Sequence, residues 1–180
     1  MAADASNVHS WAGAAVYAGP VGTTAPTDVT TALDAAFLDM GFIAEDGITR
    51  GVEHETDRHY GIHLQGSVLL KTSKRNFRPF FTFMPLEHDS DVVHLLLNPD
   101  ADISDDATTQ VREFTVPKYD ERAWIIEQVE GDTVRRMHFP RGLVSEQGDL
   151  EDSPEGISPV EITIDLIATA GVYGVELSAV

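Results

Sequence analysis

The sequence predicts a mainly β protein: an antiparallel β-sandwich or barrel with a flanking short helix, a second short helix and a long extended loop or hairpin arm. About eight or nine short stretches have strand patterns with turn residues between them, whereas only two have helical spacing. The clearest strand is VEITIDLIA at residues 160–168, in which apolar and polar residues alternate. The length is typical of one domain, so we expect a single domain over residues 1–180.

The first two predicted elements are a strand, indicated by small apolar residues, and a helix, indicated by the spacing of apolar side chains. Residues 12–18 are small and apolar and predict the first strand, ended by a Gly-Pro turn. A short helix is expected over residues 31–40, because apolar side chains recur there at intervals of three and four. Thr31 and Asp34 resemble a capping box at its start, and Gly41 stands where helices commonly end. The side chains expected to seat this helix are Leu33, Ala36, Phe37 and Met40.

A long polar segment follows a short strand predicted at residues 42–45. Residues 48–66, which include RGVEHETDRHYGIHLQG, are charged and weakly patterned, so they predict an extended loop or hairpin arm. Two strands, at residues 67–71 and 78–86, are predicted on either side of the basic run at residues 71–78.

A second short helix is predicted to begin at Ser90, whose side chain can cap its first turn, and to end at Asn98. Its expected apolar face consists of Val93, Leu96 and Leu97. Further strands are expected at residues 111–116, 123–129, 134–139 and 172–178, the second and third of them joined as a hairpin.

Acidic residues dominate the composition. Thirty Asp and Glu against 12 Lys and Arg give a net charge of −18, and all 12 bases lie between Arg50 and Arg141. Such a chain is expected to repel nucleic acid rather than bind it. Three interpretations of the acid excess remain open: solubility, adaptation to high salt, and functional repulsion of a polyanion. The basic run Lys71, Lys74, Arg75 and Arg78 is more simply a counter-charge for an acidic surface, which in a self-assembling protein can belong to the next subunit.

Other chemistry is excluded or weakly supported. Without cysteine there are neither disulfides nor thiolate sites. No apolar run approaches the roughly 18 residues of a transmembrane helix, and the first residues lack the basic region of a signal peptide. The nucleophile-elbow, P-loop, dinucleotide-binding and HExxH motifs are absent, so we expect no enzyme activity and no cofactor.

Residue spacing suggests two metal hypotheses. His54, His59 and His63, with carboxylates between them, suit zinc or nickel in type, and they support an alternative function as a metal-dependent hydrolase. Their spacing matches no known site geometry, so no metal is expected. Asp100 and Asp102 copy the start of a calcium loop whose glycine and final glutamate are missing, so an acidic solvated loop is predicted there instead.

A monomeric carbohydrate-binding β-sandwich is another alternative, and it requires exposed tryptophan platforms. The sequence has Trp11 and Trp124, both in apolar strand contexts, so we expect each to pack in the core.

Several stretches, taken in order, resemble a known family. They are GAAVYAGPVGT, TALDAAFLDMGFIAEDGI, GSVLLKTSKRNFRPFFTFMPLE, RRMHFPRGLVSEQGDL and SPVEITIDLIAT. Together they are similar to the major tail tube protein of long-tailed, non-contractile bacteriophages (the siphovirus type), particularly those of actinobacterial hosts. The resemblance covers nearly the whole chain.

The resemblance implies a structural virion protein that assembles into stacked homohexameric rings, forming a hollow tail tube through which genomic DNA passes without specific binding. It implies partners among the other tail proteins (tape measure, tail tip and tail terminator), no membrane association, synthesis in the host cytoplasm and location in the virion tail. The inner tube protein of a contractile tail or of a type VI-like injection system is an alternative with the same fold.

The resemblance also implies that the predicted arm makes contacts within and between rings. By position, its candidate residues are Arg50, Glu53, His54, Glu55, Asp57, Arg58, His59, Tyr60 and His63. If each of six subunits gave four strands to an inner barrel, strands about 4.8 Å apart and tilted by about 40° would leave a bore of roughly 38 Å between side chains. Six copies carry a formal charge of −108 (6 × −18), which disfavours contacts with phosphate.

Overall fold

The computed structural model describes residues 8–64, 66–87, 89–105, 108–150 and 159–179. In that part the chain is mainly antiparallel β structure with one short helix, α1 (Asp91–Leu97). The strands are β1 (Gly13–Pro20), β2 (Leu38–Asp39), β3 (Thr49–His63), β4 (Gly66–Phe83), β5 (Ile103–Asp105), β6 (Gln110–Arg112), β7 (Glu121–Glu130), β8 (Thr133–Gln147), β9 (Ile162–Leu166) and β10 (Val175–Ser178).

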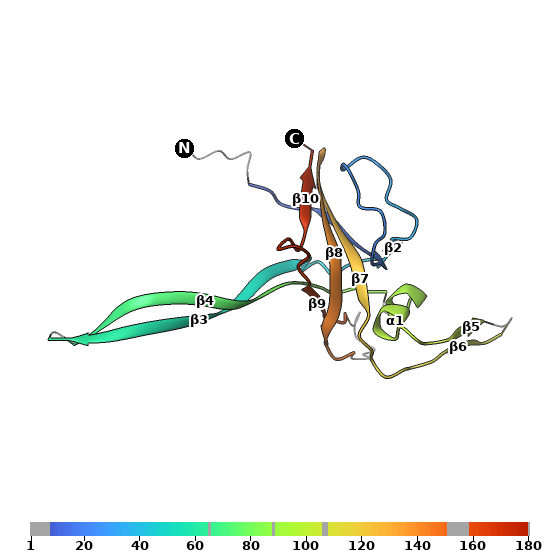
Figure 1. Ribbon diagram of the computed structural model, residues 1–180. Coiled ribbons are helices and arrows are strands. Elements are labelled where there is room, and N and C mark those ends of the chain that lie inside the picture. The colour runs from blue at the N-terminus through green and yellow to red at the C-terminus, as the bar shows by residue number, and fades with distance from the viewer. Residues whose placement is uncertain (1–7, 65, 88, 106–107, 151–158, 180) are drawn as a thin grey trace.

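One large sheet has the strand order β2-β1-β7-β8-β9-β4-β3, while β5 and β6 form a separate pair (Figure 1). The long strand β8 has two partners on one edge: its first half pairs with β10 and its second half with β9. The tight β7–β8 turn contains Gly131, whose φ of 57° suits glycine better than other residues. The hairpin predicted at this place is confirmed.

The sheet curls around its main apolar core. The Trp124 ring on β7 lies 5.6 Å from that of Phe81 and 6.2 Å from that of Phe83, both on β4. Three strand spacings separate β7 from β4, which in a flat sheet is about 14 Å. The two parts of the sheet therefore face each other, and the predicted antiparallel, sandwich-like fold is confirmed. Among the described residues the sheet does not close into a barrel.

The second predicted helix is confirmed as α1. Ser90 accepts a hydrogen bond from the backbone N–H of Val93 at 3.3 Å, and Asn98 ends the helix. Val93 and Leu96 are buried and join the main core. Local signals specify this helix, because cap and apolar spacing lie within nine residues of each other.

The helix predicted over residues 31–40 is wrong. The chain instead makes turns and then the short strand β2, which pairs with β1. The Asp28 carboxylate accepts hydrogen bonds from the backbone N–H groups of Thr30 and Thr31, at 2.7 and 2.6 Å. Arg136, from β8, donates to the carbonyls of Asp28 and Thr31, both at 2.8 Å. These side-chain contacts compete with the first helical turn for the backbone groups.

The four side chains expected on one helical face are therefore divided. Phe37 is buried with Ile125 and the half-buried Leu33 on one face of the sheet, whereas Met40 lies fully buried in the core on the other face. Ala36 is exposed. An extended backbone turns successive side chains to opposite sides, so residues 37 and 40 separate where a helix would bring them together.

Three smaller predictions change. The strand expected at residues 42–45 is only a single bridge between Ile43 and Pro85. Strand β4 runs without a break through residues 71–78, which were predicted to separate two strands, and it accommodates Asn76 at a φ of 53° beside a bulge. Trp124 is buried as predicted, but Trp11 is only half buried, with the Arg135 guanidinium 4.2 Å from its ring centre.

His138 on β8 is a buried polar side chain whose Nε2 has no hydrogen-bond partner in the described part of the chain. Its ring meets the edge of Phe37 at 6.2 Å. Burial lowers the pKa of His138 below its ordinary value of 6.5. The folded protein therefore holds this imidazole neutral at a pH where the unfolded chain protonates it.

We expect this group to weaken the fold in mild acid. Because the unfolded state binds the extra proton, the free energy of unfolding should fall as the pH drops below about 6.5, and should stop falling once the folded state is protonated too. His138→Phe removes the titrating group, so urea unfolding should show a flatter pH dependence between about pH 7.5 and 5. His59→Phe on the exposed strand β3 is the control and should keep the wild-type slope. Identical slopes for all three proteins would contradict the assignment.

Candidate assembly surfaces

A long hairpin projects from the body of the molecule (Figure 1). Strands β3 and β4 pair from Thr49↔Thr82 to His63↔Gly66. Strand β4 also pairs with β9, but only through Phe80–Phe83, so the part of β4 before Phe80 has β3 as its only strand partner in the described chain. We call residues 49–79 the arm.

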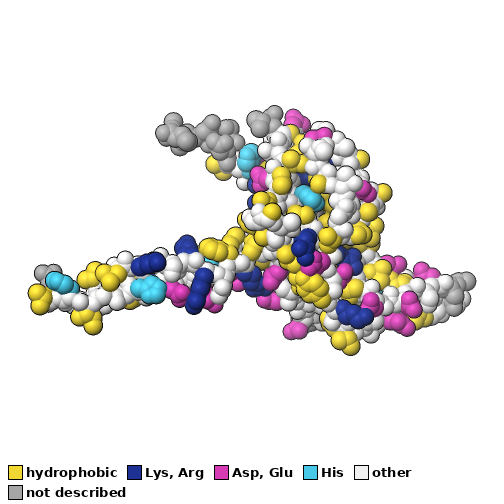
Figure 2. All heavy atoms as spheres, in the orientation of Figure 1, with side chains coloured by type: hydrophobic (Ala, Val, Ile, Leu, Met, Phe, Trp, Pro, Cys, Tyr) yellow, Lys and Arg dark blue, Asp and Glu magenta, His cyan; other side chains and the backbone are white. Residues whose placement is uncertain are grey.

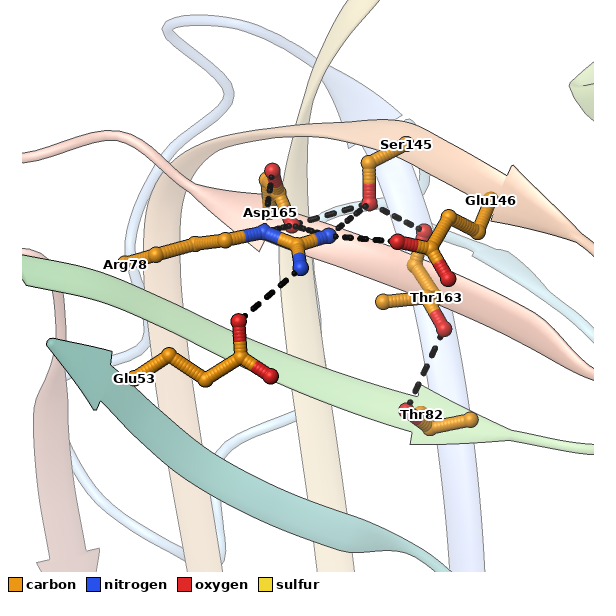
Figure 3. A network of polar contacts seen from close by, with 7 residues as sticks. All are labelled: Glu53, Arg78, Thr82, Ser145, Glu146, Thr163 and Asp165. Carbon is orange, nitrogen blue, oxygen red and sulfur yellow. Dashed lines mark hydrogen bonds and ion pairs between the residues drawn. The ribbon is translucent and has the colours of Figure 1, made fainter. Parts of the chain in front are cut away.

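Arg78 fixes the root of the arm to the body (Figure 3). Its Nε donates to both carboxylate oxygens of Asp165 on β9 at 2.9 Å. Its terminal nitrogens donate to Glu53 on β3 at 3.1 Å, and to Ser145 and Glu146 on β8 at 3.2 and 3.0 Å. These hydrogen bonds, the one to Asp165 foremost, raise the pKa of Arg78 above its ordinary value. One guanidinium thus joins three strands where the arm leaves the sheet.

Removing this guanidinium should loosen the arm without unfolding the body. Because the site is partly open to solvent, we expect Arg78→Met to lower the free energy of unfolding by only about 1 kcal/mol. The arm should become more sensitive to limited proteolysis near residue 50. Arg75→Met is the matched control, since among the described residues Arg75 forms ion pairs only with Glu55 and Asp57 inside the arm. Equal proteolysis of the two variants would show that Arg78 does not orient the arm.

The outer part of the arm exposes large apolar side chains. Ile62 and Leu64 are 91% and 96% exposed, and none of the described residues between 56 and 74 is buried. Figure 2 shows hydrophobic side chains, drawn as yellow spheres, towards the end of the arm. The further exposed apolar residues there are Tyr60, Val68, Leu69 and Leu70. A two-stranded ribbon is marginally stable alone, and an exposed apolar surface marks an interaction site.

A second projection extends on the other side of the body, and we call residues 99–120, which include β5 and β6, the acidic loop (Figure 1). It holds six acids and two bases, a formal charge of −4. Both bases are already paired, Arg112 with Asp91 at 3.0 Å and Lys118 with Asp100. Exposed apolar residues also lie here: Val111, Phe114, Val116 and Tyr119.

The charge of the molecule is divided between the arm and the rest. The arm holds six bases and three acids, a charge of +3, so the remaining chain carries −21 (−18 − 3). A cationic arm on a strongly acidic body favours contact between copies of the chain over contact with nucleic acid.

The chain matches a protein-family model described as phage tail tube protein over residues 1–175. The chain belongs to the phage tail tube protein family. A comparison with curated protein sequences gave no match. The tail tube protein is therefore a structural component of a virion tail, one that assembles with itself and with other tail proteins.

The candidate arm residues of the tail tube protein all lie on β3, from the root outward. At the root of the arm, Nη1 of Arg50 lies 3.9 Å from the carboxylate oxygen Oε2 of Glu176. Further out, the His54 ring stacks on Phe77 at 5.8 Å. The outermost members are Arg58, His59, Tyr60 and His63. Their contact with other subunits stays a prediction.

The three histidines do not converge. His54 and His59 are five residues apart on one strand and so point to opposite faces, while His59 and His63 share a face about 13 Å apart. Among the described residues, no group of three His, Cys, Asp or Glu side chains is arranged to hold a metal ion. No described helix of the tail tube protein is long and apolar enough to cross a membrane.

The sequence predicted an acidic solvated loop from Asp100 onward, but not the exposed apolar side chains that accompany its acids in the structure. Residues 111–116 were predicted to be a strand, but only Gln110–Arg112 belong to one, and its partner is β5 rather than the main sheet. The available signal was the combination of acids with Phe114 and Val116, which are 87% and 81% exposed. The alternation of apolar and polar residues in a sequence does not reveal whether another layer of the protein covers the apolar face of the predicted strand.

Proposed function

We propose that the tail tube protein forms homohexameric rings that stack into the hollow tube of a long, non-contractile tail, and that phage DNA passes through this tube. The family match over residues 1–175 carries the tube role. Two exposed projections on opposite sides of the body support repeated contact between copies. Contacts between two different surfaces of identical subunits produce a closed ring when the rotation from one subunit to the next divides a full turn evenly.

The charge of the body supports passage of DNA without binding. Six copies carry a formal −108 (6 × −18), and half of the 12 bases that offset part of the acid in each copy lie on the arm. A wall without free Lys and Arg forms few of the phosphate contacts that retain DNA. Four strands from each of six subunits would leave a bore of roughly 38 Å, wide enough for a hydrated duplex.

The proposed partners are the tape measure, tail tip and tail terminator proteins, and the proposed site of synthesis is the host cytoplasm. The non-contractile assignment rests on the stretches that resemble such tails, among them residues 31–48. A sheath gene beside the gene for this chain would instead assign it to the inner tube of a contractile tail.

Negative-stain microscopy of the purified full chain tests the proposal. We expect rings or tubes with a central hole and sixfold end views, at protein concentrations from the micromolar to the millimolar range. Duplex DNA mixed with these tubes at low salt should show no retardation in a gel. Compact monomers at every concentration would contradict the tube, and firm DNA binding would contradict passage without contact.

A further inference from the structure

We propose that one face of the arm docks on the acidic loop of a second copy of the chain. The arm face consists of Arg58, Tyr60, Ile62, Leu69 and Lys74, and its partner is residues 99–120 of the neighbour. The proposal rests on the self-assembly proposed above and names the two surfaces that meet.

The strand register defines the arm face. Arg58, Tyr60 and Ile62 alternate along β3, so their side chains leave the same side of the ribbon. Leu69 is the β4 partner of Tyr60, and Lys74 is the partner of Thr56, two residues before Arg58. Paired residues share a face, so two cations and three exposed apolar side chains lie together.

The two faces of the arm differ in how their charges are satisfied. On the opposite face, Glu55 and Asp57 both pair with Arg75, at 3.3 and 3.1 Å. On the docking face, Arg58 and Lys74 form no ion pair within the described chain, and no acid lies beside them. Their charge is available to a partner.

The acidic loop offers the complementary pattern. Asp102, Asp105 and Glu113 are exposed and form no ion pair with any described residue. Phe114 and Val116 are exposed next to them. At the base of the loop is a cleft of about 240 Å³ whose lining is half apolar and half polar. Its apolar lining residues are Leu96, Leu97, Pro99, Pro117 and Val144.

Other acids are poorer partners for this arm face. Glu45 and Asp46 lie in a turn close before β3, and Asp132 lies at a hairpin turn. Neither place combines several unpaired acids with a run of exposed apolar side chains, as the acidic loop does. Opposite charge steers and orients such a contact, while the apolar area contributes most of its strength.

Geometry makes the contact intermolecular. The arm and the acidic loop extend from opposite sides of the body (Figure 1), so one molecule cannot bring its own two surfaces together. Apolar and basic side chains gather on one projection, and acidic and apolar side chains on the other (Figure 2). A head-to-tail contact of this kind repeats from copy to copy, which produces closed rings or helical stacks.

Two charge-reversed proteins test the contact. The arm variant is Arg58→Glu with Lys74→Glu, and the loop variant is Asp102→Lys with Glu113→Lys. Each variant alone meets like charge at the contact, so sedimentation and negative-stain microscopy should show assembly only at a concentration at least about tenfold above wild type. A one-to-one mixture should recover assembly, because each reversed arm then meets a reversed loop.

Lys71→Glu is the matched control, since it reverses one cation on the opposite face of the arm that forms no ion pair with the described residues. We expect it to assemble more nearly like wild type than Lys74→Glu alone does. If wild type assembles and the mixture of reversed proteins does not recover, the arm does not dock on the loop, although the tube role stands. If wild type itself stays monomeric throughout, the proposed tube fails, and the docking fails with it.

Discussion

A tail tube protein whose arm is cut back to its root should remain folded and fail to form tubes. Replacing residues 56–74 by Asn-Gly joins Glu55 to Arg75, which are paired in the register, through a two-residue hairpin turn. None of the described residues removed is buried, so the core keeps all of its contacts. The exposed apolar tip and the free cations of the arm are lost together.

Circular dichroism with urea unfolding measures the fold, and negative-stain microscopy measures assembly. We expect a change of less than about 1 kcal/mol in the free energy of unfolding, as for other exposed changes. The control keeps the length and register of the arm and replaces His54, His59 and His63 by Asn. It should form tubes, which would also separate the arm from the metal hypothesis. Normal tubes from the shortened protein would refute the role proposed for the arm.

Features specified by nearby residues were predictable. The helix α1 needs only the Ser90 cap and the spacing of Val93 and Leu96. Strand β9 and the β7–β8 hairpin likewise show their alternation and turn residues directly. In each case the structure satisfies the local preference, so the pattern and the fold agree.

The failed helix at residues 31–40 shows where local patterns stop. Its apolar spacing is real, but Phe37 and Met40 are used on opposite faces of the sheet. The contact that stabilises the non-helical conformation of this segment comes from Arg136, which lies 105 residues beyond Thr31. Tertiary contacts of this range override a short helical preference, and nothing within the segment signals them.

The assembly surfaces were predictable only in part. The polar character of residues 48–66 indicated an arm, but the unbroken β4 depends on pairing along the whole of β3. The docking face appears only once the register aligns Lys74 with Thr56 and Leu69 with Tyr60. Charge composition indicated a counter-charge for a neighbour, whereas the position of the acidic loop needed the fold.

The two tryptophans should differ sharply in their effect on stability. Trp124 is fully buried, its ring meets the edges of Phe81 and Phe83, and its Nε1 donates to the Gly142 carbonyl at 3.2 Å. Trp124→Ala removes apolar burial, leaves a cavity where the two parts of the sheet meet and removes the hydrogen bond to the Gly142 carbonyl. We expect a loss of about 3–5 kcal/mol in the free energy of unfolding.

Trp11→Ala is the internal comparison, because the same substitution acts there on a half-buried ring. Its main loss is the contact with the Arg135 guanidinium at 4.2 Å, for which we expect about 1 kcal/mol. Far-UV circular dichroism in urea is the suitable measurement, since either substitution alters the fluorescence signal itself. The curled sheet explains the difference: Trp124 joins β7 to β4 across the core, whereas Trp11 packs on the Arg135 side chain near the start of β8. Equal losses for the two variants would mean that the sheet does not depend on this aromatic contact.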